Sequence, residues 1–156
     1  MTKEPEDLFN SEKQIESKVK IERKDGEPTS AFKGASLAAL IIGVSAYLIG
    51  LFNAAMELNE KGYYFAILIF GLYASVSLQK AVRDKDEGIP VTNIYYGISW
   101  FSTILAIVLL AVGLWNATLL PSEKGFYAFA YLLGIFGAIA VQKNTRDSQI
   151  FESPNN

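Results

Sequence analysis

The sequence has neither a cysteine nor a histidine in its 156 residues. Their absence excludes disulfides, thiolate nucleophiles and the usual zinc ligands. Charge is also scarce, because four runs of 23, 18, 35 and 18 residues contain no Asp, Glu, Lys or Arg; they lie at 34–56, 62–79, 88–122 and 125–142. A soluble domain of this length has too little interior to bury four such runs. The pattern therefore indicates a membrane protein.

The four charge-free runs are long enough to cross a lipid bilayer. A helix of 18 residues rises about 27 Å, close to the thickness of the hydrocarbon core of a bilayer. Flanking lysines that reach the interface extend the two shorter runs. We expect an all-α membrane protein with four transmembrane helices, over about residues 35–55, 62–82, 94–119 and 125–141.

The start of the chain is as rich in charge as the spans are poor in it. Residues 1–33 hold 7 Lys or Arg and 8 Asp or Glu, so we expect a charged, mostly disordered tail in which residues 7–24 form a transient helix. The alternative is that the helix over residues 7–24 lies on the membrane surface or on a partner. The first span follows this tail without an A-x-A cleavage pattern, which favours a retained span over a signal peptide. The expected organisation is a tail at 1–33, a two-helix repeat at 34–84, a loop at 85–93, a second two-helix repeat at 94–147 and a polar tail at 148–156.

The basic residues are divided unequally between the two sides of the membrane. The tails and the middle loop hold 12 Lys or Arg, whereas the two short loops hold one each, Lys61 and Lys124. By the positive-inside rule both termini and the middle loop are cytoplasmic. An aromatic belt is then expected at the outer face, from Phe52, Tyr63, Tyr64, Trp115, Phe126 and Tyr127. The net charge of −2 gives no reason to expect a nucleic-acid partner.

The chain repeats itself after 63 residues. Residues 50–84 align without a gap on residues 113–147, and 13 of the 35 positions are identical. This similarity indicates an internal duplication of a two-helix hairpin. Because each unit crosses the bilayer twice, both have the same topology and are parallel repeats about an axis along the membrane normal.

Most of the identities lie at the two ends of the hairpin. The outer-turn motif reads E-K-G in both repeats, and it consists of Glu60, Lys61, Gly62, Glu123, Lys124 and Gly125. Its glutamates suit the positive end of a helix dipole, and we expect the residues just before it to be N-caps, namely Asn59 and Ser122. The inner-face motif reads Q-K-x-x-R-D, and it consists of Gln79, Lys80, Arg83, Asp84, Gln142, Lys143, Arg146 and Asp147. Its cations suit a helix C-terminus and fix the orientation in the membrane.

Small residues occupy equivalent places within the spans of the two repeats. They are spaced four apart, and the matching pairs are Gly50 and Ala54 with Gly113 and Ala117, and Gly71 and Ser75 with Gly134 and Ala138. Small residues at this spacing let helix backbones approach closely in lipid. We therefore expect these glycines to lie at helix contacts.

Several of the repeated phrases resemble one known family. The segments "GLWNA", "LNEKGYYFA", "QKAVRDKDEGIP" and "EKGFY…GAIAVQKNTRD" are similar to the YiaA/YiaB family of bacterial inner-membrane proteins, which is built from the YiaAB two-helix domain. The resemblance covers about residues 34–147 and leaves out the charged tail. It implies a protein of the bacterial inner membrane with two copies of the domain, and it implies no established activity.

The spans offer little chemistry for catalysis or coupled transport. They contain no ionisable side chain near mid-membrane, and the sequence has no nucleophile motif, so we expect no enzyme activity, no cofactor and no metal. Asn53 and Asn116 are the best polar candidates, and we expect each to form an interhelical hydrogen bond near the outer face. The first hypothesis is a four-span protein that binds itself, other membrane proteins or the lipid bilayer. The alternative is a small channel or transporter with a polar pathway near these two asparagines.

Overall fold

The computed structural model describes residues 9–18 and 27–152, and within these ranges every regular element is a helix. A short helix covers residues 9–18. The four long helices are α2 (Ser30–Asn53), α3 (Leu58–Asp86), α4 (Asn93–Asn116) and α5 (Pro121–Glu152). Each is long and apolar enough to cross a bilayer, with a mean hydropathy of 2.2 in α2 and α4 and of 1.6 in α3 and α5. The predicted all-α fold with four spans is confirmed.

The ends of the chain differ in part from the expected organisation. Much of the tail for which we expected disorder, residues 1–8 and 19–26, lies outside the described residues. At the other end α5 does not stop where the apolar run stops at Gln142 but continues through the polar segment to Glu152. Polar residues follow the apolar ones without a proline or a glycine in this stretch, so nothing in the sequence breaks the helix there.

The first helices of the two repeats begin and end in the same way. The hydroxyls of Thr29 and Thr92, which are 63 residues apart, accept hydrogen bonds from the backbone N–H of Phe32 and Tyr95, both over 3.2 Å. Such side-chain caps satisfy donors that a helix N-terminus otherwise leaves free. The structural equivalence of the two repeats therefore begins before residues 50–84 and 113–147, the segments in which their sequences align best.

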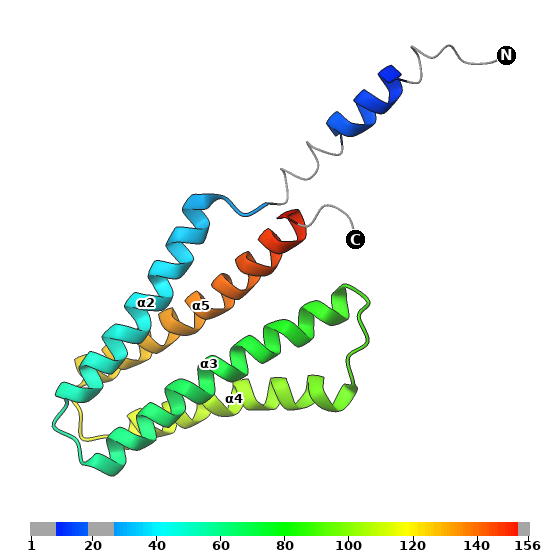
Figure 1. Cartoon of the computed structure of the whole chain (residues 1–156). Coiled ribbons are helices and arrows are strands. Elements are labelled where there is room, and N and C mark those ends of the chain that lie inside the picture. The colour runs from blue at the N-terminus through cyan, green and yellow to red at the C-terminus, as the bar shows by residue number, and fades with distance from the viewer. Residues whose placement is uncertain (1–8, 19–26, 153–156) are drawn as a thin grey trace.

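The two repeats exchange helices rather than packing as separate hairpins. α2 packs along α5 and α3 packs along α4, while the two helices of one repeat contact each other much less (Figure 1). A smaller contact between α3 and α5 joins the two pairs. The first helix of each repeat thus packs on the second helix of the other, as a pseudo-twofold relation requires. Both short turns lie at one end of the bundle, and the α3–α4 loop lies at the opposite end (Figure 1).

Glycines set the separation of α2 and α5. A Cβ atom on Gly43 would lie 2.3 Å from the backbone nitrogen of Gly134, and one on Gly137 would lie 2.3 Å from the backbone nitrogen of Leu40. The backbones are therefore in direct contact, as small residues permit in membrane helices. At the equivalent places of the α3–α4 pair the sequence has Ala106 for Gly43 and Ala74 for Gly137.

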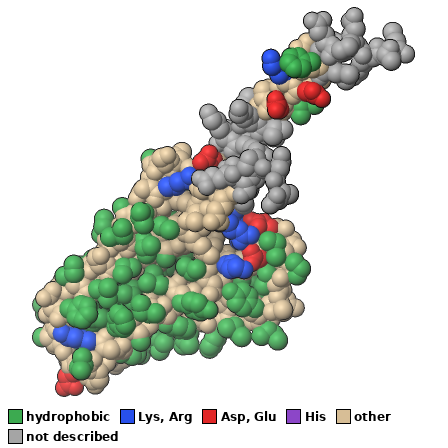
Figure 2. Space-filling model, viewed as in Figure 1, with side chains coloured by type: hydrophobic (Ala, Val, Ile, Leu, Met, Phe, Trp, Pro, Cys, Tyr) green, Lys and Arg blue, Asp and Glu red, His purple; other side chains and the backbone are tan. Residues whose placement is uncertain are grey.

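The core of the bundle is formed by tyrosines and leucines. Tyr64 and Tyr127, which are equivalent in the two repeats, stack with ring centroids 6.2 Å apart, and Tyr47 packs edge-on against Tyr127 at 5.4 Å. Tyr64 and Tyr127 are buried, so their expected place in an outer aromatic belt is wrong, whereas Trp115 is 85% exposed. Hydrophobic side chains cover much of the visible outer face, and charged ones gather at the two ends of the bundle (Figure 2).

Candidate functional site

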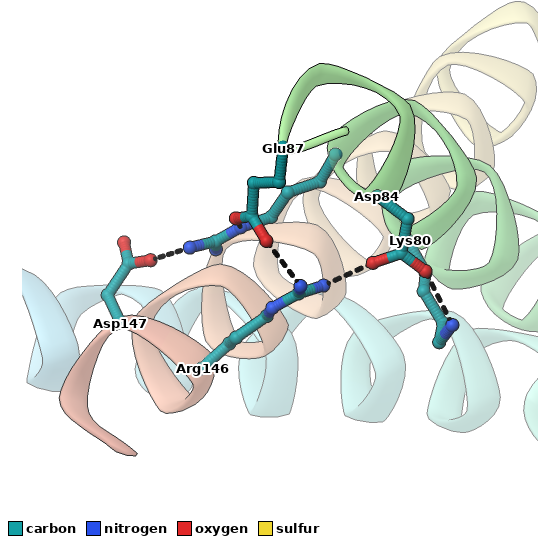
Figure 3. Close-up of polar contacts among 6 residues, drawn as sticks. Lys80, Asp84, Glu87, Arg146 and Asp147 are labelled. Carbon is teal, nitrogen blue, oxygen red and sulfur yellow. Dashed lines mark hydrogen bonds and ion pairs between the residues drawn. The ribbon is translucent and has the colours of Figure 1, made fainter. Parts of the chain in front are cut away.

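The two copies of the inner-face motif meet at one end of α3 and α5. Arg146 of the second copy donates from Nη1 to Oδ1 of Asp84 in the first over 2.7 Å, and Arg83 of the first donates from Nη2 to Oδ1 of Asp147 in the second. The two ion pairs are equivalent under the shift of 63 residues. The repeated R-D step is thus a reciprocal clamp between the repeats (Figure 3).

Two further side chains extend the clamp into a network. Lys80 donates to Oδ2 of Asp84 over 2.7 Å, and Glu87 accepts from both Arg83 and Arg146 over 2.6 Å each. Three cations and three carboxylates balance within the network, which we call the charged clamp: Lys80, Arg83, Asp84, Glu87, Arg146 and Asp147. Asp84 is only 5% exposed. A carboxylate so buried is held in its charged form by the two cations that bind it.

Sequence reasoning placed these residues at the inner interface but missed that they bind one another. It assigned their cations to the helix C-terminus and to orientation alone, and it omitted Glu87. The sequence held part of the signal, because the repeat places an R-D step at equivalent positions, but it does not show which aspartate each arginine binds. The remaining members of the motif lie outside the clamp: Gln79, Gln142 and Lys143.

The charged clamp is suited to joining helices rather than to chemistry. Each of its carboxylates is engaged by a guanidinium or an ammonium group, which leaves no free base. Among residues 9–18 and 27–152, no three His, Cys, Asp or Glu side chains are grouped to hold a metal ion. These ion pairs join α3 of the first repeat to α5 of the second.

The outer-turn motif ties each turn to the helices on both sides of it. Glu60 accepts from the backbone N–H of Glu57 over 3.0 Å, and Lys61 donates to the carbonyl of Phe52 at the end of α2 over 2.9 Å. In the second repeat Glu123 accepts from the backbone N–H of Leu120 over 2.8 Å, and Lys124 donates to the carbonyl of Trp115 over 3.3 Å. The glutamate thus caps the helix that begins and the lysine caps the helix that ends. The glycines that complete the motif, Gly62 and Gly125, have no neighbour within 4 Å of an added Cβ.

The expected N-caps at the outer turns are both wrong by two residues. α3 already begins at Leu58, so Glu57 is its N-cap and Asn59 lies inside the first turn. α5 begins at Pro121, so Ser122 is also within the helix. Proline fits the first helical position because its missing N–H would be unpaired there anyway.

The two asparagines do not form the interhelical hydrogen bonds that we expected. Asn53 donates from Nδ2 to the carbonyl of Ile49, and Asn116 donates to that of Val112, each over 2.8 Å within its own helix. Both side chains are exposed. Asparagine side chains commonly bond the carbonyl four residues earlier in their own helix, and both bonds here are of this local kind. A hollow of about 240 Å³ adjoins Asn116, between α3 and α4.

A buried polar contact that the sequence analysis missed joins α2 to α5 at the other end. Asn144 donates from Nδ2 to the hydroxyl oxygen of Ser36 over 2.8 Å, and Ser36 donates in turn to the carbonyl of Lys33 over 2.9 Å. Asn144 is 4% exposed and Ser36 is 2% exposed. Position 81, which is equivalent to Asn144, is alanine, so the repeat offered no signal for this contact.

The structure places the four candidate packing glycines against aromatic or backbone atoms. An added Cβ on Gly50 would lie 2.7 Å from the ring of Phe126, and one on Gly113 would lie 2.7 Å from the ring of Tyr63. These two contacts are equivalent in the two repeats. Gly71 faces the hydroxyl of Tyr131, and Gly134 faces α2 at Gly43 and Val44. The equivalent glycines of the second pair thus serve different neighbours.

Comparison with known proteins identifies relatives over most of the chain. The model of the yiaA/B two helix domain matches twice, at residues 32–84 and 95–147. Inner membrane protein YiaA of Escherichia coli is 55% identical over 130 residues, which cover 83% of this chain and 90% of that protein. Uncharacterized membrane protein YubF of Bacillus subtilis is 42% identical over 60 residues, 38% of this chain and 69% of that protein. Inner membrane protein YiaB of Escherichia coli is 28% identical over 100 residues, 62% of this chain and 82% of that protein.

No solved structure matches the chain. The family resemblance inferred from the repeated segments is confirmed by the two matches of the domain model and by the similarity to YiaA. Both matched segments contain an outer turn and an inner-face motif, so every residue of the charged clamp except Glu87 lies within a matched segment.

Proposed function

Because this chain belongs to the yiaA/B two-helix domain family, we propose that it is a non-enzymatic inner-membrane protein that acts through helix–helix association, with itself or with other membrane proteins. It is an integral membrane protein with four apolar helices, and the relatives described above carry names that state a membrane location without an activity. Association with a protein partner and the placement of both termini in the cytoplasm are parts of this proposal.

The observation that carries this proposal is the contrast between the inside and the outside of the bundle. The polar side chains of the charged clamp and of the outer turns are bound within the chain. By contrast, only 22% of the most apolar window of α2 and of α4 is buried. Large side chains on these helices face outward, among them Ile41 at 56% exposure and Phe101 at 65%. The surface available to a partner is therefore the apolar outer face of α2 and α4.

The packing of the core argues against the alternative of a channel or transporter. A polar pathway from Asn53 and Asn116 would have to pass the layer formed by Tyr47, Tyr131 and Leu68, each of which is 0% exposed. The hollow at Asn116 ends at Tyr64, which is itself buried. The described part of the bundle has a close-packed centre at this level, as a protein that acts by association requires.

The distribution of basic residues supports cytoplasmic termini. The charged clamp carries three of the basic side chains, Lys80, Arg83 and Arg146, at the end of the bundle where the α3–α4 loop lies. The opposite end carries only Lys61 and Lys124, which are engaged by helix carbonyls. By the positive-inside rule the clamp faces the cytoplasm.

Photo-crosslinking in native membranes tests the association. A photoreactive amino acid replaces Ile41 or Phe101 in the full chain, and a third variant carries it at Asp86 as a control that is exposed but outside the apolar face. We expect a discrete protein adduct from Ile41 or Phe101 after irradiation, and none from Asp86. Lipid adducts alone from both apolar positions would contradict the proposal.

A further inference from the structure

The two helix pairs differ in how closely they pack. α2 and α5 meet backbone to backbone at Gly43, whereas the equivalent position in α4 is Ala106. On the looser side, a cavity of about 800 Å³ lies between α3, α4 and α5. Ligand sites in proteins typically measure about 300–1,000 Å³. A smaller hollow of about 390 Å³ lies between α2 and α5, so the larger opening is on the side where alanine replaces the glycine.

The cavity is apolar inside and charged at one end. Branched aliphatic side chains of two helices line its interior, namely Ile107 of α4 with Ile135 and Ile139 of α5. Its charged end is formed by Arg83 and Asp86 of α3 and by Lys143 of α5. We call this end the mouth. Arg83 is balanced by Glu87 and Asp147 within the charged clamp, so Lys143 is the cation of the mouth that has no ion pair among the described residues, and Asp86 is the carboxylate there.

The cations at the mouth have capacity left for an anion. Lys80 pairs with Asp84, but the equivalent Lys143 has no ion pair among the described residues, because Arg83 occupies Asp147, four residues further along α5. Arg83 itself leaves its Nη1 atom buried and without a hydrogen-bond partner. An uncompensated buried donor is costly unless something supplies an acceptor. The asymmetry of the clamp therefore directs unpaired positive charge toward the cavity.

A buried hydroxyl supplies an independent sign of a ligand. Ser75 lines the cavity, is 1% exposed, and its Oγ atom has no hydrogen-bond partner. Gln79, one helical turn closer to the mouth, also lines the cavity. Along α3 the cavity therefore presents a guanidinium at Arg83, then an amide at Gln79 and then a hydroxyl at Ser75, with aliphatic side chains opposite.

We propose that this cavity binds an anionic phospholipid of the leaflet on the side of the chain termini. Its phosphate is bound by Lys143 and Arg83, its ester carbonyls lie along Gln79 and Ser75, and one acyl chain occupies the aliphatic interior. A glycerophospholipid presents phosphate, ester and hydrocarbon in the same order as the side chains of the cavity. Trp100, which also lines the cavity and is 43% exposed, has the amphipathic ring that proteins place at the level of lipid headgroups. The proposal goes beyond association with proteins, because it assigns a lipid site to the hollow between α3, α4 and α5.

Lipid retention by the full chain tests the site. The protein is reconstituted with equal amounts of phosphatidylglycerol and phosphatidylcholine, purified in mild detergent, and the retained lipids are counted by native mass spectrometry. We expect retention of phosphatidylglycerol over phosphatidylcholine. Lys143→Gln should lower this preference about fivefold, the weight of one cation near an anionic lipid surface. Lys80→Gln is the matched control, because Lys80 holds the equivalent place but does not line the cavity.

A cavity-filling variant tests the interior. Thr103→Trp places a large ring in the cavity and should remove the retained lipid, with the melting temperature measured in parallel. If this variant fails to fold, the comparison of Lys143→Gln with Lys80→Gln decides. Equal retention of both lipids by the parent, equal effects of the two lysine variants, retained phosphatidylglycerol in a folded Thr103→Trp protein, or a dimer of the chain with no retained lipid would each overturn the proposal.

Discussion

The Nη1 atom of Arg146 in α5 lies 2.7 Å from the Oδ1 atom of Asp84 in α3. Arg83 of α3 forms the equivalent ion pair with Asp147 of α5, in the reverse direction. A single R-D step, written once in each repeat, thus produces two crossed ion pairs. In a membrane, lipid supplies no hydrophobic force that drives helices together. Polar contacts at the ends of helices therefore contribute to which helices pair. The clamp therefore selects which second helices meet.

The clamp predicts unequal effects for its two aspartates. Asp84→Asn should destabilise the protein by about 1–3 kcal/mol, because Asp84 is buried and its loss leaves Lys80 without a carboxylate and Arg146 with Glu87 alone. Asp147→Asn should cost less, because Asp147 binds one cation, Arg83, and is more exposed. Thermal unfolding of both variants in the same detergent measures the difference. Equal losses would mean that the clamp does not hold α3 against α5.

The close approach of α2 and α5 predicts that Gly→Ala substitutions at different positions lower the stability of the protein by different amounts. Gly43→Ala should destabilise by about 1–3 kcal/mol, because the added Cβ meets the backbone of Gly134 and overpacks the crossing. Gly134→Ala should be tolerated, since its Cβ would lie at an ordinary 3.4 Å from Val44. Gly97→Ala is the control, with nothing within 4 Å of the new atom. If Gly43→Ala melts at the temperature of the parent, the backbone contact is not formed.

The local hydrogen bonds of the outer asparagines predict small and additive effects. Asn53→Ala and Asn116→Ala should each change the free energy of unfolding by about 0.5 kcal/mol or less, and the double variant should show their sum, because the two side chains share no partner. Asn144→Ala should cost more, about 0.6–1.7 kcal/mol, since it breaks a buried bond between helices. If the double variant of Asn53 and Asn116 loses clearly less free energy of unfolding than the sum of the single variants, the two asparagines share a site.

The exchange of helices predicts that neither half of the chain is complete by itself. A chain cut after Gly88 yields two halves, and each half then lacks the helix on which its own first helix packs. Co-expressed halves should copurify, while the first half alone should associate with itself. Affinity purification of a tag on one half measures the first outcome. If each half is monomeric and stable in detergent, the helices pack within the repeats and the described pairing is wrong.

The orientation predicts which added cysteines react from outside the cell. The chain has no cysteine of its own, so single replacements can be read without background. A cysteine in place of Ser122, in an outer turn, should react with an impermeant thiol reagent, and one in place of Asp86 should react only after the membrane is opened. The opposite pattern of labelling would reverse the topology inferred from the basic residues.

The sequence predicts the architecture well because membrane spans follow from local composition. Charge-free runs of sufficient length identify the four helices, and the 63-residue shift identifies the two units. Helix ends were predicted less well: Asn59 was expected as a cap because of its residue type, yet Glu57 is the cap, since the helix starts where the extended turn ends.

Contacts between helices were harder to predict than the helices. A repeat shows that Arg83 and Arg146 are equivalent, but it does not show whether each arginine binds the aspartate of its own copy or that of the other. The buried bond of Asn144 with Ser36 depends on a position that the repeat does not share, because Ser99 is equivalent to Ser36 but Ala81 is equivalent to Asn144. Such information resides in the relative placement of helices, and small residues such as Gly43 set that placement through their lack of a side chain.

The pairing of α2 with α5 also fixes the order in which the protein is completed during synthesis. Ser36 and its partner Asn144 are separated by 108 residues, which a ribosome making about 5–20 residues per second translates in about 5–22 s. For that time α2 lies in the membrane with its glycine surface uncovered, whereas α3 and α4 pair as soon as α4 follows. The final helix to be translated is therefore the one that closes the bundle, and a pause in its translation prolongs the interval in which a foreign helix can take its place.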